Sequence, residues 1–137
     1  SGKIYFELQD YINELKNENV HIVRIEQLYP FPYDALIQEI KRFAHCEIIW
    51  CQEEPKNMGA WEFIRARLDS VLVKITSKQK NVPFVGRRSA ASPATGVYER
   101  HLANQKNILR LSIEADINEI HKEKDGVSLV KYKLPIE

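Results

Sequence analysis

Apolar residues recur at helical spacing in four stretches of this chain, and short apolar runs lie between these stretches. Residues 3–17 carry apolar side chains at every third or fourth position with polar ones opposite, which predicts an amphipathic helix. A second helix is expected after Pro32, a third over residues 59–76, and a fourth from about residue 95. The intervening runs are rich in β-branched or aromatic residues and predict three strands, at 20–26, 48–51 and 82–86.

This alternation of helices and strands predicts an α/β fold with a doubly wound, mainly parallel sheet and helices on both faces. Such a sheet normally opens with a strand, whereas this sequence opens with a helix, so we expect the sheet to lack its first strand. In the fourth helix the inward-facing residues are expected to be Tyr98, Leu102, Ile108 and Leu109.

Beyond residue 113 the pattern weakens. Residues 114–124 are compatible with a prolongation of the fourth helix, and residues 128–134 alternate as a one-sided strand would. We therefore expect an α/β domain over residues 1–113 and a C-terminal extension over residues 114–137.

Composition narrows the class of protein. A chain of 137 residues with 44% hydrophobic and 28% charged residues is typical of one globular domain. A net charge of +1 gives no electrostatic basis for binding nucleic acid, and no apolar run reaches the roughly 20 residues of a membrane span. Two cysteines do not form a disulfide framework, which favours a reducing compartment: the bacterial cytoplasm or the mitochondrial matrix.

Two adjacent carboxylates, Glu53 and Glu54, follow the second strand and invite a catalytic interpretation. Catalysis by paired carboxylates requires that burial or proximity separate their pKa values, whereas adjacent residues leaving a strand usually diverge. A loop facing solvent, an interface or a neighbouring active site is therefore favoured. Its polar residues are Gln52, Glu53, Glu54 and Asn57.

The segment before the fourth helix is a candidate anion site. Arg87 and Arg88 are followed by small polar residues at a helix N-terminus, where free amides and the helix dipole favour a phosphate. Helix capping and pairing of the arginines with acids explain the same residues equally well. His101 lies about one and a half turns into that helix and is expected to reach the same place. The candidate regulatory nucleotide site comprises Arg87, Ser92, Thr95, Gly96 and His101.

Other chemistry is not indicated. The spacing of His45, Cys46 and Cys51 fits no zinc pattern, and no serine or cysteine nucleophile comes with a recognisable base. The sequence predicts no catalytic residue, no cofactor-binding residue and no metal ligand in this chain.

Three runs together carry a resemblance to a known family: RIEQLYPFPYDAL at 24–36, WCQEEPKNMGAW at 50–61 and FVGRRSAASPATG at 84–96. Over about residues 1–111 the chain resembles the C-terminal domain of the thiamine-diphosphate-dependent, decarboxylating component of 2-oxoglutarate dehydrogenase. Arg88 departs from the family, in which proline or aspartate is common at that position. The matching motif positions are Gln52, Glu53, Glu54, Asn57, Gly59, Trp61, Arg87, Ser92, Pro93, Gly96 and His101.

The resemblance implies a transketolase C-terminal-like fold within an oxidoreductase of the tricarboxylic acid cycle. Such an enzyme decarboxylates 2-oxoglutarate and passes the succinyl group to the lipoyl arm of its dihydrolipoyl succinyltransferase partner. Thiamine diphosphate and magnesium are held by the other domains of the enzyme, and their motif is absent here, so this chain alone is expected to be inactive.

In the family the C-terminal domain helps to build the homodimer, and some members bind AMP or acetyl-CoA as an effector. Two alternatives stay open from the sequence. One is a free-standing nucleotide- or phosphate-binding α/β module, and the other is the equivalent domain of a different thiamine-diphosphate enzyme.

Overall fold

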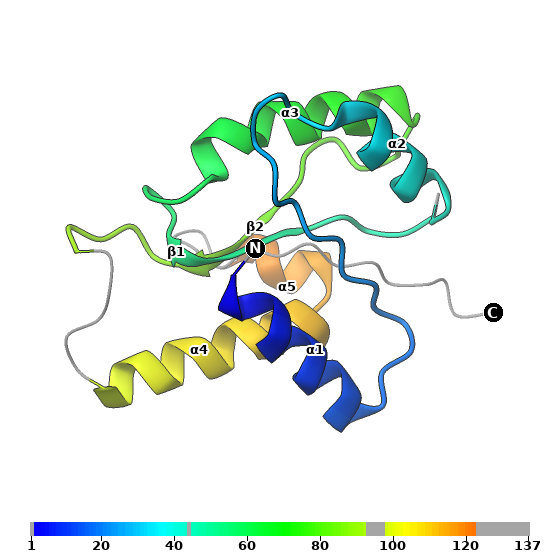
Figure 1. Ribbon diagram of the computed structural model, residues 1–137. Coiled ribbons are helices and arrows are strands. Elements are labelled where there is room, and N and C mark those ends of the chain that lie inside the picture. Colours follow the sequence, from blue (N-terminus) through cyan, green and yellow to red (C-terminus); the bar gives the residue numbers. More distant parts are fainter. Residues whose placement is uncertain (1, 44, 93–97, 123–137) are drawn as a thin grey trace.

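The computed structural model describes residues 2–43, 45–92 and 98–122 (Figure 1). Helices cover both faces of a small central sheet. The elements, in chain order, are α1 (Lys3–Leu15), α2 (Tyr33–Lys41), β1 (Trp50–Pro55), α3 (Trp61–Lys74), β2 (Phe84–Arg87), α4 (Tyr98–Ile113) and α5 (Ile117–Lys122).

The sheet consists of β1 and β2, which run parallel, with Trp50 opposite Phe84 and Cys51 opposite Val85. The next matched pair is Pro55 with Arg87, so that residues 52–54 of β1 lie opposite the single residue Gly86. Helix α3 connects the two strands. The predicted α/β class with a parallel sheet and helices on both faces is thereby confirmed, in a part of the fold that contains two paired strands.

Two helical layers enclose the sheet. Helices α2 and α3 lie on one face, and α1, α4 and α5 lie on the other (Figure 1). Successive side chains alternate between these layers: Ile49, just before β1, and Val85 pack with α1 and α4, whereas Trp50 and Phe84 pack with α3. Each fully buried aliphatic side chain of this kind contributes about 1.5–3 kcal/mol relative to exposure. We call the buried cluster that contains Ile49 and Val85 the α1 layer, and the buried cluster that contains Trp50 and Phe84 the α3 layer.

Helix α1 agrees with its prediction. Ile4, Leu8 and Ile12 recur every four residues, so they share one face, and all three are buried in the α1 layer. The helix ends at Leu15, and the next residue, Lys16, adopts a left-handed conformation with φ of 49° and closes the last turn through its N–H.

The prediction of a strand at 20–26 was wrong. These residues are extended, but no strand pairs with them among the described residues. A strand is defined by its main-chain ladder, and the ladder in the described part of the chain joins only β1 and β2.

The bounds of the other two strands also differ from prediction. Strand β1 begins at Trp50 and continues to Pro55, so Glu53 and Glu54 lie within the strand and not in a loop after it. Strand β2 begins at Phe84 because the N–H of Val82 donates to the Asp69 side chain at 3.1 Å and not to a strand.

The third helix is confirmed within two residues at each end, but the fourth differs in its orientation. Tyr98 and Leu102 are 73% and 42% exposed, not inward, because the first turns of α4 extend past the end of the sheet (Figure 1). Further along the helix, Ile108 is buried as predicted.

The predicted prolongation of the fourth helix over residues 114–124 is wrong for residues 114–122, and residues 123 and 124 lie outside the described part. Helix α4 ends at Ile113, and α5 begins with a cap in which the Asp116 side chain accepts the Glu119 N–H at 2.8 Å. Ala115 and Ile120 pack in the α1 layer. The boundary between residues 113 and 114 stays a prediction, and the predicted strand at 128–134 lies outside the described residues.

Candidate functional site

The loops that follow the two strands meet at one edge of the sheet. The N–H of Lys56 donates to the Arg87 carbonyl at 2.9 Å. One residue further, the Asn57 side chain bonds both main-chain groups of Ala90: its amide donates to the carbonyl at 2.9 Å, and its oxygen accepts the N–H at 3.1 Å. Through these two hydrogen bonds, Asn57 holds the loop after β2 against the loop after β1.

Gln52 shapes the first of these loops from within. Its side chain is only 5% exposed and lies toward the α3 layer. The side-chain oxygen accepts the Trp50 indole N–H at 3.0 Å, and the amide donates to the carbonyl oxygens of Met58 at 2.7 Å and Pro55 at 3.2 Å. Gly59 has φ of 68°, and a Cβ there would stand 3.0 Å from the Gln52 amide nitrogen. Gln52 thus determines the path of the turn from β1 to α3.

A second polar group lies on the opposite face of the sheet, between β1, β2, α1 and α4. Its centre is Gln105 on α4, which is 7% exposed. The Gln105 amide donates to the Glu7 carboxylate and, at 3.5 Å, to that of Glu53. We call this group the Gln105 network. Its members are Lys3, Glu7, Glu53, Arg87, His101 and Gln105.

Arg87 enters this network from the end of β2. Its Nη2 atom lies 3.1 Å from His101 Nδ1 and donates to the Gln105 side-chain oxygen at 3.3 Å. Because a guanidinium only donates, His101 accepts through Nδ1, which assigns the tautomer without a proton on that atom. The Arg87 Nε atom is buried and has no hydrogen-bond partner among the described residues. Arg87 is therefore held in place while one buried donor stays unused.

The carboxylate of Glu7 responds to these contacts. Partial burial alone would raise the pKa of Glu7, but hydrogen bonds from Lys3 and Gln105 outweigh it, and the pKa lies below its usual value. Lys3 Nζ lies 2.6 Å from Glu7 Oε1. The network balances two cationic side chains, Lys3 and Arg87, against two carboxylates.

The cysteines carry no reactive site. Burial raises the pKa of the Cys51 thiol to about 12, so the thiol stays protonated at neutral pH. Burial likewise raises the pKa of Cys46. Cys51 packs against the α1 layer and Cys46 against the α3 layer. Both are free, as the sequence predicts.

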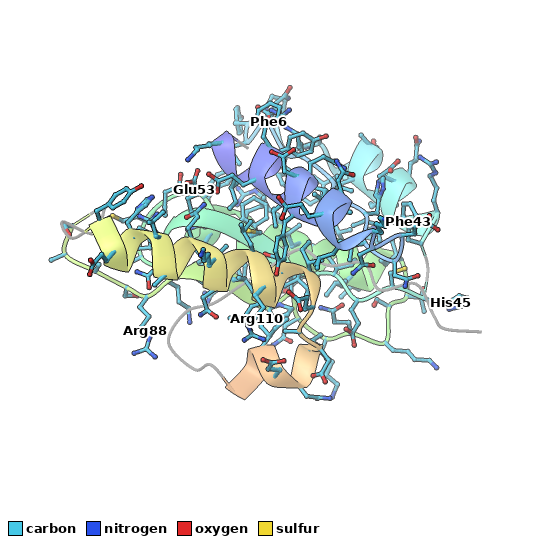
Figure 2. All side chains as sticks on the ribbon, turned by 90° about the horizontal axis from the view of Figure 1, so that it is seen from below. Phe6, Phe43, His45, Glu53, Arg88 and Arg110 are labelled. Atoms are coloured by element: carbon cyan, nitrogen blue, oxygen red, sulfur yellow. The ribbon has the colours of Figure 1, made fainter. Side chains whose placement is uncertain are left out.

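The predicted nucleotide-site residues are brought together only in part. Arg87 and His101 are neighbours, Ser92 is exposed, and Thr95 and Gly96 lie outside the described residues. Arg88 and Glu53 lie on opposite sides of α4 in Figure 2, and Arg88 projects away from the network.

The predicted interface loop divides between the two faces of the sheet. Gln52 belongs to the α3 side and Glu53 to the Gln105 network, whereas Asn57 joins the two loops.

Sequence reasoning missed Lys3, Glu7 and Gln105. Helical spacing contained the signal for two contacts, because Lys3 and Glu7, and likewise His101 and Gln105, are four residues apart and share a helix face. The pairing of Glu7 with Gln105 joins helices 98 residues apart in sequence and had no local signal.

The part of the chain that the structure describes contains neither a metal-ligand cluster nor a helix suited to a membrane. No three histidine, cysteine, aspartate or glutamate side chains there are grouped to hold a metal ion. No helix in it has the length and apolar character needed to cross a bilayer.

Comparison with known proteins gives a consistent result. Residues 1–113 match the family described as 2-oxoglutarate dehydrogenase C-terminal. Over 103 residues the chain is 52% identical to the 2-oxoglutarate dehydrogenase E1 component of Brucella anthropi, and equally to those of Brucella ovis and Brucella canis. These matches cover 75% of this chain and 10% of each relative, so the chain spans about a tenth of the length of these relatives. The chain belongs to the 2-oxoglutarate dehydrogenase C-terminal family.

Proposed function

We propose that this chain is the C-terminal domain of a 2-oxoglutarate dehydrogenase E1 component. The polypeptide to which it belongs decarboxylates 2-oxoglutarate and transfers the succinyl group to the lipoyl arm of a dihydrolipoyl succinyltransferase. The domain itself contributes to the homodimer and to regulation. The observation that carries this proposal is the family match over residues 1–113, together with 52% identity to three E1 components. The same membership supports the cytoplasm, or the mitochondrial matrix, as the compartment.

The chemistry of the chain supports binding of the cofactors by other domains of the polypeptide. Its described residues offer no set of ligands for magnesium, so the proposal assigns magnesium and thiamine diphosphate to the rest of the polypeptide. Glu53 is engaged by Gln105 within a polar network, and the Cys51 thiol is protonated at neutral pH. We accordingly assign neither group a catalytic role.

The proposal is tested by comparing the complete polypeptide with this chain and with a form that lacks residues 1–137. With thiamine diphosphate and magnesium, the complete polypeptide is expected to release carbon dioxide from 2-oxoglutarate, and this chain is expected to give no turnover above background. Light scattering is expected to show the complete polypeptide as a dimer and the shortened form with a lower mass. Turnover by the isolated chain, or its absence from the complete polypeptide, would overturn the assignment.

We further propose that the regulatory site for AMP or acetyl-CoA lies at Arg87 and His101, next to the loop that contains Ser92, Thr95 and Gly96. The supporting observation is the buried, unused Nε donor of Arg87 beside a histidine at 3.1 Å. A phosphate is a bidentate acceptor for such a guanidinium, and the neutral His101 ring, which accepts through Nδ1, carries a further donor at Nε2.

Calorimetry with AMP and with acetyl-CoA tests this site on the complete polypeptide. Arg87→Ala is expected to weaken binding at least tenfold. Arg88→Ala is the matched control, because it removes the same charge from a side chain that projects away from the network, and it is expected to change the affinity less than twofold. Equal affinities of the wild type and Arg87→Ala would exclude the site, and the domain assignment would be unaffected.

A further inference from the structure

The outer edge of β2 carries buried main-chain groups that lack partners. The carbonyl oxygens of Pro83 and Arg87 each accept an N–H from the β1 side at 2.9 Å. Because successive residues of a strand direct their main-chain groups to opposite sides, Phe84 and Gly86 direct theirs away from β1. Phe84 is 6% exposed and Gly86 is buried, and no described residue pairs with this side of β2. Buried main-chain groups are nearly always paired in folded proteins, so this edge calls for a partner.

The helices of the α1 layer show which element lies nearest to this edge. Residues 22–25 lie on the side of β1 away from β2, where they line a 30 Å³ cavity together with Trp50 and the first turn of α1. Helix α1 therefore lies under the edge of the sheet opposite to β2. Figure 2 shows α4 between α1, in blue, and α5, in orange. Helix α5 thus lies on the side of α4 that faces the outer edge of β2.

The direction of α5 leads the chain to the end of β2. Arg87, the last residue of β2, lies 3.1 Å from His101 in the first half of α4, and α4 runs back along the sheet from there (Figure 1). Helix α5 reverses again and runs toward the start of α4 (Figure 2). The chain that leaves α5 after Lys122 therefore starts near the end of β2 that carries Arg87.

The sequence that follows α5 has the pattern of an edge strand. Residues 123–137 lie beyond the described residues and beyond the family match, which ends at residue 113. Within them, residues 128–134 read SLVKYKL, with apolar or aromatic side chains alternating with lysines from Val130 onward. Residues 123–127 contain the turn signal Asp-Gly and span up to roughly 17 Å when extended. This length allows the alternating run to lie beside β2.

The handedness of crossovers determines the direction of such a strand. Crossovers between parallel strands are right-handed in about 98% of cases. The crossover from β1 to β2 passes over the face covered by α3, whereas α4 and α5 cover the other face. A right-handed crossover through α4 and α5 would consequently return to the β1 side of β2, a place that β1 already occupies. A strand at the outer edge of β2 must therefore run antiparallel to it.

We infer that residues 128–134 pair with the outer edge of β2 as an additional, antiparallel strand of the sheet. This strand supplies main-chain partners for Phe84 and Gly86, and it starts at the Arg87 end, where α5 directs the chain. Its lysines protect the new edge of the sheet against pairing with another chain. The edge of β2 is thus covered by a segment that lies outside the part shared with the family.

Hydrogen exchange resolved to single amides, by electron-transfer fragmentation in a mass spectrometer, tests this inference on the full 137-residue chain and on the complete polypeptide. The test variant combines Val130→Pro with Lys131→Pro. Because adjacent residues point to opposite sides, the pair removes one donor to β2 in either register. The amides of Phe84 and Gly86 are expected to exchange at least tenfold faster in this variant than in the wild type.

The matched control combines Val130→Ile with Lys131→Arg, which keeps both N–H groups and the character of both side chains. It is expected to retain the protection of Phe84 and Gly86 within twofold. The amide of Val85, which faces β1, serves as an internal reference and is expected to change less than twofold in either variant. Equal exchange of Phe84 and Gly86 in the wild type and the double proline variant would overturn the inference, because the edge would then be covered by something else.

Photo-cross-linking provides a second readout that does not depend on stability. With the photoreactive residue benzoylphenylalanine in place of Tyr132, irradiation is expected to join the tail, within one chain, to the peptide that contains residues 82–88. Mixing chains of two isotopic labels distinguishes links within a chain from links between chains. Cross-links that avoid this peptide, or that join only separate chains, would contradict the inference. Neither readout depends on enzymatic activity, so failure here leaves the proposed function untouched.

Discussion

The buried side chain of Gln52 makes more hydrogen bonds than its size alone would suggest. It satisfies the Trp50 indole and the carbonyl oxygens of Pro55 and Met58 at a place that water does not reach. Such a residue is costly to replace, because each buried partner that is left without a bond costs about 1–3 kcal/mol.

Gln52→Leu is therefore expected to lower the free energy of unfolding by about 3 kcal/mol, measured by urea denaturation, since leucine keeps the volume but leaves several polar groups unsatisfied. Gln38→Leu serves as a control because Gln38 is exposed on α2, and its effect is expected to stay within about 0.5 kcal/mol. A loss below about 1 kcal/mol for Gln52→Leu would contradict the role assigned to this side chain.

Glu7 makes stability depend on pH. Since its pKa is lower in the folded chain than in the unfolded chain, ionised Glu7 stabilises the fold above its unfolded pKa. That contribution is lost as the pH falls through the lowered, folded-state pKa. Glu7→Gln is expected to reduce stability at pH 7 by on the order of 1 kcal/mol and to approach the wild type at pH 3.

Chemical denaturation between pH 3 and pH 7 measures this difference. Glu14→Gln on the same helix is the control, because the Glu14 side chain is exposed. A constant gap between Glu7→Gln and the wild type over this pH range would refute the linkage.

The sequence indicated some of these residues and not others, for a physical reason. Gln52, Glu53, Asn57, Arg87 and His101 were recognisable because they lie at or just after the end of a strand-like run, or in the first turns of a helix. Gln105 was not, because a glutamine in a helix is ordinary until the partners on other elements are known. Those partners are brought together by the tertiary fold, which local patterns do not encode.

Strands β1 and β2 approach closely where three residues of one face a single residue of the other. A Cβ on Gly86 would lie 2.9 Å from the Gln52 carbonyl oxygen and 3.2 Å from that of Glu54. These are main-chain atoms of β1, so they cannot move aside without parting the strands.

Gly86→Ala is accordingly expected to destabilise the chain by about 2–3 kcal/mol in thermal or urea unfolding. Gly2→Ala is a useful comparison, because a Cβ there meets no atom within 4 Å and only the left-handed backbone, with φ of 69°, opposes it. We expect a cost of at most about 1 kcal/mol at Gly2. Equal effects at the two glycines would show that close packing at Gly86 is not what matters.

Elements with a strong local signal were predicted well, and elements that depend on neighbours were not. The apolar stripe of α1 and the long pattern of α3 gave helices with nearly correct bounds. The pattern at 20–26 was read correctly as strand-like in its side chains, yet a strand also needs a partner, and no described strand pairs with it. Tyr98 and Leu102 were misplaced because helical periodicity does not reveal where the sheet beneath a helix ends.

At the scale of the whole molecule, the order of helices and strands was sufficient to predict a parallel α/β arrangement. The three sequence runs were sufficient to identify the family. The layering could not be assigned helix by helix, since it depends on the direction of each crossover. The structure supplies that direction: α2 and α3 on one face, and α1, α4 and α5 on the other (Figure 1).

The position of Gln105 between two carboxylates has a consequence for the ageing of the protein. Spontaneous deamidation would convert its amide into a third acid beside Glu7 and Glu53, and the donor that now holds both carboxylates would become a repelling charge. A single hydrolysed amide at this place would loosen α1, α4 and the end of β1 together, without any change to the genetic sequence.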